Sequence, residues 1–167
     1  YSIEAALNSG IFDEVMVSTD DEEIAQTARA AGAQVPFMRS EETSTDMANT
    51  ADVLLEVFDE YEKRGQHFDY GCCIYPTAPF VTPDKLQDAM RLLQDSGAQS
   101  IIPMTEFSYP PQRGLFINET GEVEMLHPEY AATRSQDLQK QYHECGQFYI
   151  FRMDAFKKQK DTTMEHS

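Results

Sequence analysis

The chain has 167 residues, 41% of them hydrophobic, so it is long enough to bury a core of its own. Its formal net charge of −16 argues against nucleic acid and anionic membranes as partners, because both carry negative charge themselves. No apolar run approaches the roughly 18 residues needed to span a bilayer, and no secretory signal pattern is seen. The three cysteines, Cys72, Cys73 and Cys145, have neither disulfide-framework nor zinc-site spacing. We therefore expect reduced thiols in a cytoplasmic protein.

The first third of the chain predicts alternating helices and strands. Residues 2–9 have helical composition, and Gly10 suits the position after a helix end. Residues 13–20 are rich in valine and alternate in their middle, which is typical of a strand. Acidic residues then open a helix that runs to about Ala31, with Asp20 as its expected N-cap. A second short strand is expected over residues 33–37.

The same alternation continues toward residue 104. Residues 48–64 predict a long helix with one apolar face, and residues 70–75 predict a buried strand that is apolar on both faces. Thr82 followed by Pro83 is a well-formed helix start, and a strand is expected over residues 100–104. Helices between strands favour parallel pairing, in which ligands lie beyond the carboxyl ends of the strands.

After residue 106 the pattern changes. Two short strands, residues 114–117 and 123–126, flank a hairpin-like turn, and residues 147–151 predict a return to the main sheet. We therefore expect an α/β fold with a mostly parallel sheet and a small β excursion over residues 106–142.

Four ordered segments resemble a known family: residues 12–25, 36–46, 75–81 and 133–149. Their order and spacing are similar to those of the CMP-sialic acid synthetases, a family of nucleotide-sugar cytidylyltransferases, and most of all to its pseudaminic acid branch. The resemblance implies a Rossmann-like three-layer α/β/α nucleotidyltransferase fold of the glycosyltransferase-A kind. It also implies that residues 1–167 form one such domain.

Two parts of the family pattern are not found between residues 1 and 167. One is an initial strand with a Gly-rich basic loop that cradles the CTP triphosphate, and the other is a late Asp-x-Asp pair that binds Mg²⁺. We therefore expect a domain truncated at both ends, with no metal ligands in this chain, no assigned catalytic residue, and no CMP transfer by this chain alone.

The resemblance implies a nucleotide side to the site. It assigns the cytosine base to Arg39, whose planar fork suits a carbonyl and a ring nitrogen; the alternative is a surface pair with Glu41 or Glu42. Tyr75 stands where the family usually has Gln, as in the pseudaminic acid branch. The nucleotide-binding candidates are Arg39, Thr50, Tyr75, Pro76, Thr77 and Pro79. Thr50 has an equally good alternative as a first-turn helix residue without a ligand.

The resemblance also implies a sugar side. A sugar carboxylate needs a charged partner, for which a bidentate arginine is the strongest available. The sugar-binding candidates are Arg134, Gln136, His143, Gln147, Tyr149 and, on weaker alignment, Arg113. The alternatives are a solvated turn for Arg134 and Gln136, a core position for Tyr149 and a simple polar contact for His143.

The implied activity is transfer of CMP from CTP to an acidic nine-carbon sugar, with Mg²⁺ as cofactor and pyrophosphate as the second product. The resemblance further implies a homodimer joined through residues 106–142, and a product that feeds glycosylation of surface structures such as flagellin. Two alternatives stay open: a synthetase for CMP-sialic or CMP-legionaminic acid, and a non-catalytic α/β module that binds a nucleotide or a partner. No G-x-G-x-x-G follows a strand, so a Rossmann dehydrogenase is disfavoured.

Overall fold

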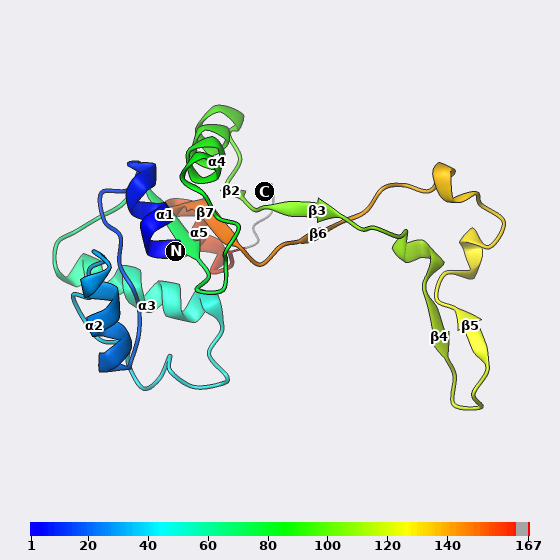
Figure 1. The fold of residues 1–167 in the computed structure, drawn as a ribbon, viewed down its shortest axis with the longest axis horizontal. Helices are drawn as coiled ribbons and strands as arrows, with labels where there is room; N and C mark the ends of the chain where they lie inside the picture. Colours follow the sequence, from blue (N-terminus) through cyan, green and yellow to red (C-terminus); the bar gives the residue numbers. More distant parts are fainter. Residues whose placement is uncertain (163–166) are drawn as a thin grey trace. The chain divides into compact units, whose positions relative to one another are not determined.

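A computed structural model describes residues 1–162 and 167, which form two compact units. Unit 1 comprises Tyr1–Ile102 and Gly146–Ser167, and unit 2 comprises Pro103–Cys145 (Figure 1). Unit 1 contains α1 (Ser2–Ser9), α2 (Glu22–Ala30), α3 (Thr50–Lys63), β1 (Tyr70–Ile74), α4 (Pro83–Ser96), β2 (Ser100–Ile101), β7 (Phe148–Arg152) and α5 (Met153–Gln159). In the described part of the chain, no helix is long and apolar enough to cross a membrane.

The sheet of unit 1 has the strand order β1-β7-β2, and both of its pairings are antiparallel. This corrects the expectation of a mostly parallel sheet. β1 and β2 do run in the same direction, as a helical crossover through α4 requires. The late strand β7, however, lies between them and runs against both. The predicted return of residues 147–151 to the main sheet is confirmed by β7, but the sequence pattern gives no sign of its place between β1 and β2 or of its direction.

Helices cover both faces of this sheet, as the three-layer prediction requires. Alternate residues of β7 point to opposite faces. Phe148 and Ile150 belong to a core cluster with residues of α1 and α4. Tyr149 and Phe151 belong to a second cluster with Phe156 of α5 and the apolar face of α3. Each face of β7 is therefore buried against a different pair of helices.

Gly71 in β1 marks a point where the packing leaves no room for a side chain. A Cβ built there would lie 2.7 Å from Phe151 Cζ and 2.8 Å from Phe58 Cζ. The two phenylalanine rings meet edge to face, with centroids 6.1 Å apart. The glycine thus allows α3 to pack its aromatic side chain directly against the sheet.

The predicted strands over residues 13–20 and 33–37 are reduced to one parallel bridge between Met16 and Gln34. The backbone pairs at two points, Val17 N–H to Gln34 O at 3.0 Å and Gln34 N–H to Val15 O at 2.8 Å. Val15, Val17, Ala33 and Val35 pack with the buried alanines of α2, which accounts for the apolar alternation in the sequence.

Two helix ends that the sequence predicts from capping residues are confirmed. Gly10 is left-handed after α1, and Thr82 caps α4 with proline in its first turn. The predicted N-cap of α2 is wrong by one residue. Asp21, not Asp20, accepts hydrogen bonds from the backbone N–H groups of Glu23 and Ile24. The Asp20 carboxylate therefore does not cap α2 and can bond another group.

Unit 2 consists of two separate two-stranded ladders and three single 3-10 turns. β3 (Met104–Glu106) pairs with β6 (Tyr142–Glu144), and β4 (Leu115–Ile117) pairs with β5 (Val123–Met125), both antiparallel. The turns are η1 (Pro111–Arg113), η2 (Pro128–Tyr130) and η3 (Ser135–Asp137). The predicted excursion of residues 106–142 lies inside this unit. The predicted strand over residues 100–104 is instead divided between β2 and β3, two strands of different sheets, with Pro103 between them.

Candidate functional site

The first group of candidate residues lies where β1 ends in unit 1. Thr50 begins α3, Tyr75 follows β1, and Tyr149 lies in β7. The Tyr75 hydroxyl is 3.3 Å from Thr50 Oγ1, and the rings of Tyr75 and Tyr149 meet edge to face at 5.5 Å. The backbone N–H of Tyr75 donates to Gln147 O at 3.0 Å. Four residues predicted from three separate segments are thus brought together.

The antiparallel register of β1 and β7 explains why Tyr75 lies beside Gln147 and Tyr149. Cys73 pairs with Tyr149 and Ile74 with Phe148, so residue 75 continues the ladder toward Gln147. Tyr149 is only 4% exposed and belongs to the cluster that α3 covers. Its side chain is therefore a core support beneath Tyr75, and Tyr75 is the member of the pair that a ligand can reach more easily.

The turn after Tyr75 presents backbone and small side chains to solvent. Pro76, Thr77 and Pro79 are exposed, whereas Ala78 between them is buried. Ser2 Oγ donates to Tyr75 O at 3.2 Å, and Val81 N–H donates to Ala78 O at 3.2 Å. These two hydrogen bonds hold the backbone of the turn at Tyr75 and at Ala78, so the turn can form a rigid surface beneath a ligand.

Arg39 lies in the loop before α3 and is held by the residues that end the 13–20 segment. Its backbone N–H donates to Thr19 O at 2.9 Å, and its Nη2 is 3.3 Å from Asp20 Oδ1. The pKa of Asp20 is lowered, first by a hydrogen bond from its own backbone and also by Arg39. Among the described residues no acceptor bonds the buried Nε of Arg39, so any ligand contact falls to its Nη atoms. The ion pair is with Asp20, not with Glu41 or Glu42.

The other four candidates lie in unit 2. Arg134 Nε donates to Asp137 Oδ2 at 2.7 Å, its side chain is 72% exposed, and the neighbouring Gln136 is exposed in η3. Arg113 donates to the carbonyl oxygens of Tyr130, Ala131 and Thr133, so its guanidinium is engaged in holding that segment.

His143 lies on β6 of the same unit. Its ring is 4.7 Å from the Phe107 ring, and Nδ1 is 2.9 Å from Glu144 O. These contacts match the simple polar role that the sequence left open for this histidine. They do not connect it to a second titratable side chain, as a general base that is oriented by a partner would require.

The adjacent cysteines of β1 lie near the site but are poor nucleophiles. Burial raises the pKa of the Cys72 thiol above its ordinary range and that of Cys73 to about 11. A nucleophilic cysteine needs a lowered pKa, because the thiolate is the reactive form. Their place in the core clusters of both sheet faces accounts for them fully.

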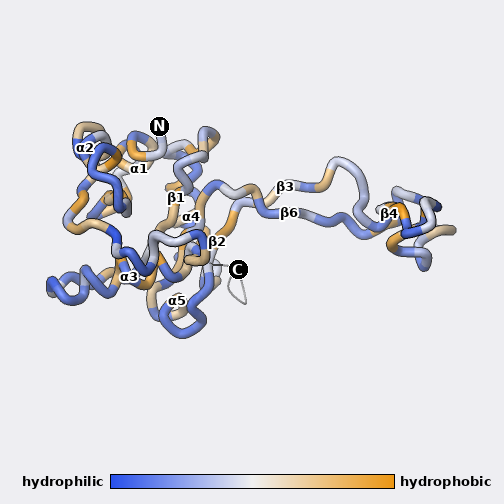
Figure 2. Tube along the Cα trace, turned by 90° about the horizontal axis from the view of Figure 1, so that it is seen from below, coloured by the Kyte–Doolittle hydropathy of each residue, from blue (hydrophilic) through white to orange (hydrophobic). Residues whose placement is uncertain are grey.

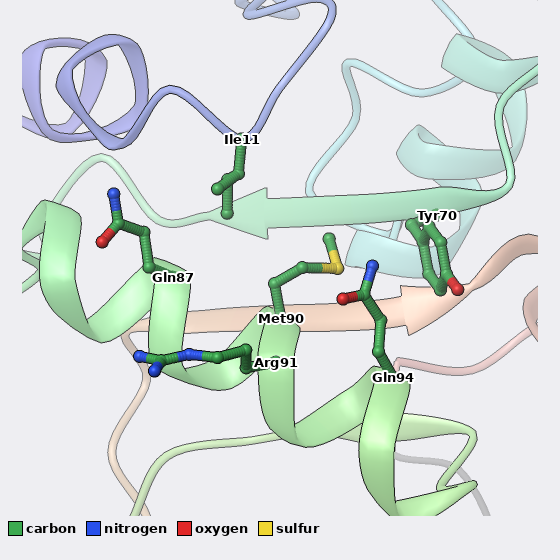
Figure 3. A pocket seen from close by; sticks show the side chains of 6 residues that line it. All are labelled: Ile11, Tyr70, Gln87, Met90, Arg91 and Gln94. Atoms are coloured by element: carbon green, nitrogen blue, oxygen red, sulfur yellow. The ribbon is translucent and has the colours of Figure 1, made fainter.

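A cavity of about 560 Å³ lies on the α4 side of the sheet (Figure 3). It is lined by Ile11, Tyr70, Gln87, Met90, Arg91 and Gln94. None of the candidate residues lines it. Arg91, its one cationic group, is already paired with Asp88. The cavity is therefore separate from the site that the sequence predicts.

Sequence reasoning missed two acidic residues around Arg39. The sequence predicts Asp20 as a helix cap, although the Asp20-Asp21 pair allows either residue that role. Glu56 of α3 accepts hydrogen bonds from Ser40 and Thr43. Its only signal in the sequence is a carboxylate beside the apolar stripe of a helix, which usually indicates a solvated position. Among the described residues, no group of three or more His, Cys, Asp or Glu side chains is arranged to hold a metal ion.

Several known proteins are similar to this chain in sequence. Over 167 residues the chain is 40% identical to a pseudaminic acid cytidylyltransferase of Campylobacter jejuni subsp. jejuni serotype O:2, covering 100% of this chain and 72% of that protein. Over 123 residues it is 29% identical to a CMP-N,N'-diacetyllegionaminic acid synthase of Legionella pneumophila subsp. pneumophila, covering 74% of this chain and 53% of that protein.

A solved structure of CMP:2-keto-3-deoxy-manno-octonic acid synthetase complexed with CTP is similar with a TM-score of 0.63. The match covers 94% of this chain and 64% of that chain at 18% identity, which shows a shared nucleotidyltransferase fold. The cytidylyltransferase family profile matches residues 1–166. With that match along nearly its whole length, the chain belongs to the cytidylyltransferase family.

Proposed function

We propose that this protein transfers CMP from CTP to a nonulosonic acid, and that the acceptor is pseudaminic acid. The observation that carries the proposal is the 40% identity of the whole chain to a pseudaminic acid cytidylyltransferase. In the reaction, the anomeric hydroxyl of the sugar attacks the α-phosphorus of CTP. The new P–O bond forms as the bond to the β-phosphate oxygen breaks, the hydroxyl proton is lost, and pyrophosphate leaves.

Unit 1 recognises the nucleotide in this proposal. Arg39 contacts the cytosine through its Nη atoms, which suit a base carbonyl and ring nitrogen. The Thr50–Tyr75 hydroxyl pair supplies both donor and acceptor capacity where an amide side chain would otherwise act. Pro76, Thr77 and Pro79 form the floor beneath the base and ribose. Positioning of this kind lowers the barrier to phosphoryl chemistry without any covalent step by the protein.

Unit 2 supplies the acceptor contacts in this proposal. Arg134 is the side chain best suited to the sugar carboxylate, since it is exposed and no acceptor among the described residues bonds its Nη atoms. Gln136 and His143 offer amide and imidazole groups to the neutral substituents of the sugar. Arg113 holds the 130–133 backbone and so supports the segment that carries Arg134.

Mg²⁺ is the proposed cofactor, because a divalent cation neutralises phosphate charge and assists a phosphate leaving group. The acidic groups of the described residues do not cluster in a way that fits the ion. No step of the reaction is therefore assigned to it through this chain's own side chains.

An acceptor panel tests the proposed function. The natural full-length protein is incubated with Mg²⁺, with CTP or UTP and, separately, with pseudaminic, legionaminic or N-acetylneuraminic acid. The nucleotide-activated sugar is identified by mass spectrometry, with pyrophosphate release as a second readout. We expect product with CTP but not with UTP, and pseudaminic acid as the preferred acceptor. Preference for legionaminic acid would support the activity in the name of the Legionella relative, CMP-N,N'-diacetyllegionaminic acid synthesis, instead. Equal product formation from UTP would contradict the cytidylyltransferase proposal.

We propose in addition that two copies associate through the β4–β5 hairpin. Leu115, Phe116 and Ile117 follow one another in β4 and are all exposed, so both faces of the strand are apolar in unit 2. Figure 2 shows this stretch as hydrophobic, whereas β6 is hydrophilic. A two-stranded hairpin that exposes apolar side chains to solvent on both faces is only marginally stable on its own. Sedimentation should give a dimer, and Ile117→Lys should give a monomer; a monomeric parent protein contradicts the proposal.

A further inference from the structure

One carboxylate of α3 fastens the loop that follows Arg39. The backbone N–H of Ser40 donates to Glu56 Oε1 at 2.8 Å, the Ser40 hydroxyl donates to Oε2 at 3.1 Å, and the Thr43 hydroxyl also donates to Oε2. Burial raises the pKa of Glu56, but the hydrogen bonds from Thr43 and Ser40 outweigh it, and the pKa is lowered. The group is therefore an ionised acceptor of three hydrogen bonds.

The same loop is tied on its other side to the end of the 13–20 segment. The Ser44 hydroxyl donates to Ser40 O at 2.7 Å and so closes the loop on itself. Asp20 pairs with the Arg39 guanidinium, and Thr19 O accepts the Arg39 backbone N–H. Arg39 thus stands between two anchors, one in the segment before α2 and the other on α3.

The surroundings of Glu56 exclude a direct role in holding a nucleotide. A cavity of about 440 Å³ adjoins it, and the charged residues of its lining are Glu42, Asp52, Glu56, Asp59, Glu60 and Lys63. Its one cation, Lys63, is already paired with Glu60 at 2.7 Å. Such an acidic lining repels phosphate groups. The chemistry of Glu56 is therefore directed to the Ser40–Thr43 loop.

We infer that Glu56 is a positioning residue for the nucleotide site: by fixing Ser40 and Thr43 it sets the position from which Arg39 meets the base. The inference rests on the proposed role of Arg39 in nucleotide binding. A loop held in its bound conformation loses less conformational entropy when the ligand arrives. Releasing the loop should therefore weaken nucleotide binding even though Glu56 does not touch the nucleotide.

A double-mutant cycle with CTP as the titrant tests this inference by calorimetry. Glu56→Gln keeps the size of the side chain but replaces one acceptor oxygen by a donor, so we expect about fivefold to tenfold weaker CTP binding. Thr43→Ala removes one bond from the loop side and should give a smaller loss in the same direction. Glu60→Gln is the matched control: it lies one turn away on α3, pairs with Lys63 and Arg64, and should bind CTP as the parent does.

The double-mutant cycle distinguishes a role of Glu56 in positioning Arg39 from a role only in the stability of the fold. In an Arg39→Ala background, Glu56→Gln should change CTP affinity by less than about twofold, because the residue it positions is gone. Two results would overturn the inference. One is an equal loss of CTP affinity on Glu56→Gln in the parent and in the Arg39→Ala protein, and the other is CTP affinity equal to the parent's in both Glu56→Gln and Thr43→Ala. If Arg39→Ala itself leaves CTP affinity unchanged, the proposed role of Arg39 fails, and the inference with it. That result is distinct from a failure confined to Glu56.

Discussion

The nucleotide-side and acceptor-side candidates differ in how the protein holds them. In unit 1, the nucleotide-side residue Tyr75 contacts both Thr50 and Tyr149, and Tyr149, a sugar-side candidate, lies in a core that α3 and α5 cover. In unit 2, Arg134 and His143 are exposed and bond within their own short segments. A preorganised group costs less to order on binding than an exposed one. On the proposed assignment, the base therefore meets a preorganised surface, whereas the acceptor meets exposed side chains that become ordered on binding.

The largest expected effect comes from breaking the core beneath the nucleotide side. Gly71→Ala places a Cβ 2.7 Å from Phe151 Cζ and 2.8 Å from Phe58 Cζ, and neither ring can move freely in the packed sheet–helix interface. Overpacking of this kind costs about 1–3 kcal/mol of unfolding free energy. Urea denaturation followed by circular dichroism measures the loss.

Gly114→Ala in unit 2 is the matched substitution for that experiment. Its Cβ would meet Leu126 Cδ1 at 2.8 Å and Pro111 O at 3.0 Å, and the leucine end can rotate away. We expect a cost of roughly 1 kcal/mol or less. Equal losses for the two glycine variants would contradict the contrast between a packed unit 1 and an open unit 2.

The second effect concerns the acceptor side. Arg134→Ala removes the proposed partner of the sugar carboxylate, and a charge-assisted hydrogen bond of about 1.5–3 kcal/mol corresponds to a tenfold to hundredfold higher acceptor KM. CTP binding should not change. Arg91→Ala is the control, because Arg91 forms an i,i+3 pair with Asp88 as Arg134 does with Asp137. A parallel loss of CTP affinity in Arg134→Ala would contradict the division between the two units.

The third effect is smaller and concerns one hydroxyl. Tyr75→Phe keeps the ring against Tyr149 but removes the oxygen beside Thr50, so we expect CTP binding weaker by about twofold to tenfold. Tyr70→Phe removes a hydroxyl from the other end of β1, where it accepts from Arg152 at 3.4 Å. Only the Tyr75 variant should respond in calorimetry with CTP. If Tyr75→Phe binds CTP as tightly as Tyr70→Phe and the parent protein do, the Tyr75 hydroxyl does not contact the nucleotide.

Local features of the fold were predictable from the sequence because their causes are local. Gly10 and the Thr82-Pro83 pair act within one helical turn, and the apolar run at residues 70–74 needs burial wherever it lies. The antiparallel insertion of β7 was not predictable in this way. It depends on residues 148–152 pairing with β1 across more than 70 positions of chain, and no periodicity within either segment records the partner.

The site follows the same division. Motif resemblance predicts Thr50, Tyr75 and Tyr149 as site residues; the β1–β7 register brings Tyr75 next to Tyr149, and α3 adds Thr50. The supports of Arg39 were missed because they are long-range: Asp20 is 19 residues away and Glu56 reaches back to Ser40 from the next helix. Acidic side chains are numerous in a chain with 29 of them, so no single carboxylate stands out by composition.

The smallest expected effect is a pH response that distinguishes the loop anchored by Glu56 from the exposed segments of unit 2. The folded-state pKa of Glu56 lies below its ordinary value of 4.5, since Thr43 and Ser40 hydrogen bonds outweigh burial. A lowered pKa means that the ionised group stabilises the fold above pH 4.5, and that this contribution is lost as the pH falls through the folded-state value. Urea unfolding of the parent and of Glu56→Gln at pH 7, 5, 4 and 3.5 (values roughly spanning the carboxyl range) should therefore give a stability difference that is constant at the two higher values and shrinks at the two lower ones. A difference that stays constant down to the lowest pH would mean that the charge of Glu56 does not hold the loop.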